Sequence, residues 1–88
     1  MSNLPTKIEF SKSNRKNKKY KVEFQLKGKT YKLHFGDNRY EHYKDRTPLK
    51  LYTHLNHNDK ERRIRYYLRH GTTIDPTTAK YWSNIYLW

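Results

Sequence analysis

Arginine residues recur along one segment of the chain in a pattern that suits contact with phosphate groups. Arg62, Arg65 and Arg69 are three and four residues apart, so on a helix they would share one face. A planar guanidinium can bind a phosphate through two hydrogen bonds and tolerates partial burial. Arg63 and Tyr66 fall at the edge of the same face, where the ring could rest on sugar or base edges. The spacing therefore predicts a helical surface that binds phosphates.

A second set of cations precedes this segment and consists mainly of lysine. The run SKSNRKNKK contains no apolar residue, and basic polar runs of this kind are commonly disordered until they meet a polyanion. A lysine ammonium is a compact and mobile charge, which suits loosely held phosphates. We expect a second track of phosphate contacts from the lysines of this region and of the two predicted strands that follow it. These residues are Lys16, Lys18, Lys19, Lys21 and Lys32.

The composition agrees with a polyanionic partner. Twenty Lys and Arg residues against eight Asp and Glu residues give a net charge of +12, which attracts nucleic acid, anionic membrane surfaces or acidic proteins. No stretch approaches the roughly 18 apolar residues of a membrane helix, so we expect no membrane partner. The first residues lack the apolar run of a signal peptide, and the chain has no cysteine for disulfides. We therefore expect a non-secreted, intracellular protein.

The histidines and the other polar residues do not form a recognisable catalytic pattern. His54 and His57 approach the spacing of a metal-ligand pair, but without cysteine nearby they are better interpreted as polar loop residues. A ββα metal nuclease would need His34 and His70 as its base and its ligand, and their spacing does not fit. Three glycines are too few for a phosphate-cradling loop. We predict a binding protein rather than an enzyme, with no metal, no cofactor and no small-molecule substrate.

Two alternating segments predict a β-hairpin. In residues 20–26 and again in residues 30–35, large apolar side chains alternate with polar ones, and Gly28 stands in the turn between them. Residues 6–10 alternate over a shorter stretch and could add a third, edge strand. Aromatic side chains must build most of the core, because they make up 16% of the chain while apolar residues as a whole reach only 33%.

A first helix is predicted over residues 58–70. Asn58 is its expected N-cap, with Glu61 completing a capping box, and Gly71 stands where a left-handed C-cap belongs. Ile64 and Leu68 share one face of this helix. We expect that apolar face to dock on the hairpin, because an isolated helix of this length is marginal.

A second helix is predicted from residue 77 to about residue 87, with Asp75 as N-cap and Pro76 at the first helical position. The predicted fold is α+β: a small antiparallel β-hairpin or three-stranded sheet followed by two α-helices packed on one face. We expect residues 1–19 to form a basic N-terminal arm, partly disordered, and residues 20–88 to form a single α+β domain.

Several short motifs follow one another in a fixed order over residues 20–88. They are His34-Phe35-Gly36, Tyr52-Thr53-His54, Asp59, Arg62-Arg63, Tyr66, Arg69-His70, Thr78-Ala79-Lys80-Tyr81-Trp82-Ser83 and Leu87-Trp88. By these motifs the chain resembles a family of small, basic, uncharacterised proteins found in large nucleocytoplasmic DNA viruses and some algae. The resemblance implies a viral setting and does not supply an established activity.

The expected function is sequence-independent binding of nucleic acid through backbone contacts, with DNA favoured. In a viral setting this binding would condense or package the genome, in a virion core or in the host cytoplasm or nucleus. Two alternatives stay open: an RNA-binding protein, and a virion structural or protein-interaction module that docks on an acidic partner. The sequence also leaves open a homodimer and whether Trp82 and Trp88 lie in the core or at an interface.

Overall fold

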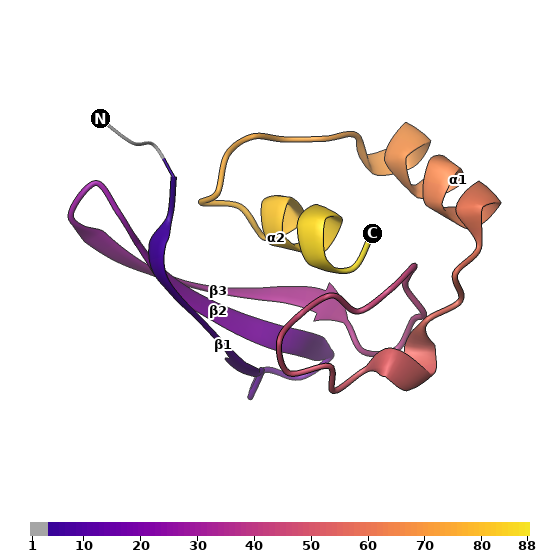
Figure 1. Cartoon of the computed structure of the whole chain (residues 1–88), viewed down its shortest axis with the longest axis horizontal. Coiled ribbons are helices and arrows are strands. Elements are labelled where there is room, and N and C mark those ends of the chain that lie inside the picture. The colour runs from indigo at the N-terminus through magenta and orange to yellow at the C-terminus, as the bar shows by residue number, and fades with distance from the viewer. Residues whose placement is uncertain (1–3) are drawn as a thin grey trace.

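Three antiparallel strands are followed in the chain by two helices, which confirms the α+β fold (Figure 1). The computed structural model describes residues 4–88. The strands pair in the order β1-β2-β3, so the sheet has the third strand that the sequence left optional. The elements are β1 (Thr6–Lys12), β2 (Lys18–Leu26), β3 (Lys29–Asp37), one turn of 3₁₀ helix (Thr53–Leu55), α1 (Lys60–His70) and α2 (Ala79–Tyr86).

The predicted hairpin is formed by β2 and β3. Val22 pairs with Leu33 in the register of the two strands, and the alternate positions of β2 are buried. The two-residue turn consists of Lys27 and Gly28, whose φ angles of 51° and 78° are both positive. A turn of this kind matches the twist of the flanking strands, and glycine adopts its second position without steric penalty.

The N-terminal segment belongs to the sheet rather than to a separate arm. β1 pairs with β2 along its length, with Phe10 opposite Val22, and a turn over residues 13–17 connects the two strands. The boundary predicted at residue 19 is therefore wrong for residues 6–19. The polar run misled the prediction because strand pairing uses backbone groups and needs no apolar side chain. Residues 1–3 of the predicted arm lie outside the described residues.

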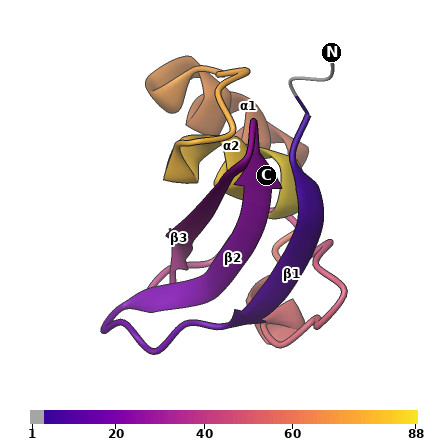
Figure 2. The ribbon, with the colours of Figure 1, turned by 90° about the vertical axis from the view of Figure 1, so that its left-hand side faces the viewer.

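The core lies between one face of the sheet and α2. Tyr20, Val22 and Phe24 of β2 are fully buried, as is Phe35 of β3. α2 crosses this face of the sheet, as the two views in Figures 1 and 2 show. Its Trp82 is 1% exposed and its ring centroid lies 4.9 Å from that of Phe24, so Trp82 is a core residue.

α2 begins later than the sequence predicts. Its N-cap is Thr78, whose side chain accepts a hydrogen bond from the backbone N–H of Tyr81 at 3.4 Å. Asp75 instead caps the preceding turn, where its carboxylate accepts hydrogen bonds from the backbone N–H and the hydroxyl of Thr77. Asp75 and Thr78 are both suitable N-cap residues. Because the backbone of Thr78 is extended, the helix begins after Thr78 and not after Asp75.

The start of α1 also differs from the prediction, while its end agrees. Asp59, not Asn58, is the N-cap, and its carboxylate accepts hydrogen bonds from the backbone N–H groups of Glu61 and Arg62. Asn58 lies before the helix with a φ of 54°. Gly71 is the C-cap, as predicted, and its φ of 71° is positive, but its ψ of −167° differs from that of the left-handed cap that was expected. Neither helix within residues 4–88 is both long and apolar enough to cross a membrane.

The predicted docking face of α1 is wrong. Ile64 is 59% exposed and Leu68 is 81% exposed, so neither packs on the hairpin. The opposite flank of the helix is attached to α2 and the C-terminal end instead. Tyr66 donates a hydrogen bond to the side chain of Asn84 at 2.7 Å, and Tyr67 donates one to the Asn84 carbonyl at 2.9 Å. These tyrosines hold α1 beside α2 at one end of the sheet (Figure 1).

The segment between β3 and α1 is irregular and is fixed by buried polar groups. The carboxylate of Asp45 accepts hydrogen bonds from the Tyr20 hydroxyl, from the backbone N–H and hydroxyl of Thr47, and from the backbone N–H of Tyr52. Asp45 and Thr47 are almost completely buried. One carboxylate therefore organises this loop and ties it to β2.

Candidate nucleic-acid interface

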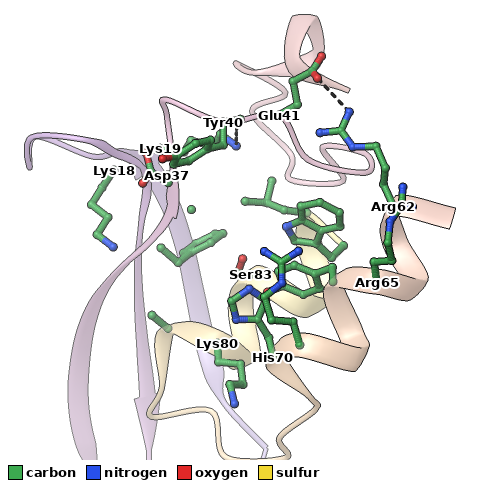
Figure 3. Close-up of a pocket in the computed structure, with 17 residues that line it drawn as sticks. Lys18, Lys19, Asp37, Tyr40, Glu41, Arg62, Arg65, His70, Lys80 and Ser83 are labelled. Carbon is green, nitrogen blue, oxygen red and sulfur yellow. Dashed lines mark hydrogen bonds and ion pairs between the residues drawn. The ribbon is translucent and has the colours of Figure 1, made fainter. Parts of the chain in front are cut away.

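A groove with a volume of about 790 Å³ lies between α1 and the end of the sheet, with α2 at its base (Figure 3). We call it the basic groove. One wall is the arginine face of α1, and the other is formed by the start of β2, the end of β3 and the residues that follow it. The basic residues that line it are Lys18, Lys19, Arg62, Arg65, Arg69 and Lys80.

Most of the positive charge in the basic groove is not neutralised by carboxylates. Glu41 pairs with Arg62 at 3.0 Å. Asp37 pairs with Arg39 at 2.7 Å, and that pairing holds the pKa of the Asp37 carboxyl at about 2. Apart from Lys19, which is buried, four cations of the groove make no ion pair with any residue from 4 to 88. They are Lys18, Arg65, Arg69 and Lys80.

The three arginines predicted to share a face do share one, and it faces the basic groove. Arg62, Arg65 and Arg69 all line it. Their orientation follows from the tyrosine contacts described above, which turn this face of α1 toward the sheet end. Lys18, from the predicted lysine track, lies on the opposite wall. The structure therefore brings together cations that are more than 40 residues apart in the chain.

Lys19 is buried and does not present its ammonium to solvent. The residue is 2% exposed, and its ammonium donates hydrogen bonds to the Tyr40 carbonyl at 2.9 Å and to His42 Nδ1 at 2.8 Å. Burial lowers the pKa of Lys19 to about 8, although nearby Asp37 and Asp45 oppose the shift. Its predicted role as an exposed phosphate ligand therefore does not fit its position, because the ammonium is already used within the protein.

Arg63 and Tyr66 are held by contacts within the protein. Arg63 Nε donates a hydrogen bond to the Trp88 carbonyl at 2.7 Å, and its guanidinium lies over the ring of Tyr43 at 5.1 Å. Tyr66 stacks on Trp88 at 4.2 Å and contacts His70 at 4.6 Å. Tyr66 lines the basic groove but has little free ring surface, so both residues position α1.

The other predicted lysines lie away from the basic groove. Lys21 and Lys32 alternate with buried residues of β2 and β3, so they face the outer side of the sheet. That side also carries acid: Lys32 pairs with Glu23 at 3.6 Å, and Glu9 lies opposite Glu23 in the register. Lys16 is exposed in the turn between β1 and β2. These lysines do not form a continuous basic track with the arginines.

The base of the basic groove includes a close approach that sequence analysis missed. Gly36 of β3 lines the groove with a φ of 77°, and a Cβ atom there would lie 2.7 Å from Leu87 Cδ1. A side chain at this position would therefore clash with the side chain of Leu87, which would have to shift. Lys80 of α2 was also missed as a groove cation, because its role depends on how α2 meets α1.

The histidines are distributed over separate parts of the fold. His34 faces the outer side of the sheet and hydrogen bonds to the hydroxyl of Ser13 at 2.7 Å, whereas His70 lines the basic groove. The pair required by a ββα nuclease is therefore not brought together. His42 is buried, and burial lowers its pKa to about 4. Among residues 4–88 no group of three or more histidine, aspartate or glutamate side chains could hold a metal ion.

Comparison with protein-family models matches the first part of the chain. Residues 8–48 match the model of DUF5754, a family of unknown function. The matched stretch runs from β1 through β3 into the following loop and covers less than half of the chain. It includes Lys18 but not α1 or α2, and the family carries no assigned function. No curated protein and no solved structure matches the chain.

Proposed function

We propose that this protein binds the phosphate backbone of nucleic acid, without sequence preference, in the basic groove. DNA is the polymer expected from the sequence, and condensing or packaging a genome in a virus particle is the role that we propose for it. The observation that carries the proposal is the set of four cations on facing surfaces of one groove, none of them in an ion pair within the described chain: Lys18, Arg65, Arg69 and Lys80.

Their arrangement supports a linear polyanion as the ligand. Arg65 and Arg69 are one turn apart on α1, while Lys18 and Lys80 come from β2 and α2. A phosphate chain along the groove would meet positive charge from several directions and would release its condensed counterions. Because each cation is fixed on a folded element, less conformational entropy is lost on binding than for a flexible basic tail.

Replacing Arg65 and Arg69 by glutamine tests the groove as the contact surface. We expect weaker binding to random-sequence DNA. The slope of log K against log salt concentration should also become shallower, by the amount that corresponds to about two lost phosphate contacts. Fluorescence anisotropy across a salt series measures both quantities. The matched control is Lys27→Gln with Lys29→Gln, which removes the same charge from the hairpin turn, outside the groove.

The two double variants separate local contact from general attraction. If the arginine variant and the turn variant lose the same affinity, net charge alone drives binding and the groove has no special role. If the wild-type protein binds neither DNA nor RNA at low salt, the proposed function is rejected.

A further inference from the structure

The basic groove has an apolar base as well as a charged rim. Ala79 of α2 and Trp88 line it and are partly exposed, whereas Phe35 and Leu87 are buried beneath them. Figure 3 shows aromatic rings in the middle of the groove, with Lys18 to the left of them, Lys80 below them, and Arg62 and Arg65 to the right. The ligand that fits this surface has an apolar body as well as negative charge.

Small residues keep this base hollow. Ala79 and Ser83 both line the groove, and each leaves space that a larger side chain would fill. The resulting volume of about 790 Å³ is in the range of pockets that enclose organic molecules of moderate size. A phosphate backbone alone would use the rim and leave the hollow unfilled. An apolar group that entered it would gain free energy through burial.

A nucleobase carried on a phosphate chain combines these two properties. In a duplex the bases are stacked on one another and enclosed by the two backbones, so their faces cannot reach a protein groove. In a single strand the faces are free, and grooves that bind single strands combine cations along the backbone with apolar or aromatic contacts to the bases. Tyr40 also lines the groove, and at 64% exposure its ring is accessible for such a contact.

We propose that the basic groove takes single-stranded nucleic acid, with phosphates on the cationic rim and at least one base on the apolar floor. This inference rests on the proposed function and specifies the class of nucleic acid. The accessible floor is formed by Ala79, Ser83 and Trp88, with Phe35, Gly36 and Leu87 packed beneath it.

Filling the floor tests the inference without changing charge. We expect Ala79→Phe to weaken binding of a labelled oligothymidine of about 12 nucleotides roughly tenfold, because one base contact is lost. Binding of a duplex of the same length should not change. The wild-type protein should prefer the single strand by a similar factor. Ser83→Phe fills the same hollow one turn later and serves as the second variant if Ala79→Phe does not fold by circular dichroism.

The outcomes distinguish this inference from the proposed function. Arg65→Gln with Arg69→Gln should weaken both single-strand and duplex binding, because it removes rim charge. The single-strand inference would be overturned if the wild-type protein bound single strand and duplex with equal affinity and Ala79→Phe changed neither affinity. Backbone binding as the proposed function would then still stand. Thymidine monophosphate should compete only weakly, and competition as strong as that of the oligonucleotide would overturn the strand as the ligand. Absence of binding to any nucleic acid would reject both proposals.

Discussion

Among individual residues, His42 is buried and hydrogen bonded through both ring nitrogens. Its Nδ1 accepts a hydrogen bond from the Lys19 ammonium, so the proton of the neutral ring lies on Nε2, which donates to Asn56 Oδ1 at 2.6 Å. Asn56 Oδ1 also accepts a hydrogen bond from the backbone N–H of Asp45 at 2.8 Å. A second proton on His42 would face the Lys19 charge within a buried site, so the fold requires the imidazole to stay neutral.

His42 should therefore make stability depend on pH. Burial, reinforced by Lys19, lowers its pKa from 6.5 to about 4. The unfolded chain binds the proton first as the pH falls, so the stability that His42 contributes is present above pH 6.5 and is lost toward pH 4, by roughly 3 kcal/mol. Urea denaturation near pH 7 and near pH 5 should show a smaller loss in His42→Gln than in the wild-type protein. The control is His54→Gln at an exposed histidine, and equal losses in all three proteins would contradict the assignment.

Gly36 and Gly28 form a matched pair for a second stability test. Both have a positive φ, but a Cβ at Gly28 would meet nothing within 4 Å, whereas one at Gly36 would meet Leu87. Gly28→Ala should cost about 1 kcal/mol of unfolding free energy from backbone strain alone. Gly36→Ala should cost roughly 1–3 kcal/mol more, because the buried side chains of Leu87 and Lys19 must shift to relieve the clash. Equal losses in thermal or urea unfolding would mean that Leu87 moves aside freely.

At the scale of elements, the two helices are attached to the molecule by different means. α2 buries Trp82 and the adjoining Leu87 against the sheet, so its position depends on apolar packing. α1 is held by hydrogen bonds and stacked rings, chiefly through Tyr66 and Tyr67, and leaves Leu68 in solvent.

Substituting Leu87 at the end of α2 and Leu68 of α1 tests this difference directly. Leu87→Ala should lower the free energy of unfolding by about 2–5 kcal/mol, because it leaves a cavity in the core. Leu68→Ala should change it by less than about 0.5 kcal/mol, since the side chain is 81% exposed. Urea denaturation measures both. A large loss in Leu68→Ala would show that α1 packs through its apolar face after all.

The sequence predicted elements better than the contacts between them. Alternation over residues 20–26 and 30–35 predicted the hairpin because strand period is a local property. The docking of α1 was not predictable in this way, because two tyrosines with hydrogen-bonding hydroxyls outweigh the Ile64 and Leu68 pair. Burial of Lys19 was equally hidden, since it depends on the Tyr40 carbonyl and a distant histidine.

At the scale of the whole molecule, the basic groove exists only when distant segments are folded together. Lys18 comes from the start of β2, whereas Arg65 and Lys80 come from the two helices. The arginine spacing along α1 was predicted from the sequence, but the opposite wall and the apolar floor were not. They arise from the way that α2 crosses the sheet and the C-terminal end returns beside α1.

Like charges on facing surfaces also repel one another when the basic groove holds no anion. Dissolved electrolyte shields that repulsion, since the Debye length shrinks to about 8 Å at physiological ionic strength. Adding electrolyte should therefore raise the free energy of unfolding of the free protein, while it lowers the affinity for a polyanion. These opposite responses come from the same few side chains, so dilute conditions that strengthen binding are also the conditions under which the empty protein is most easily unfolded.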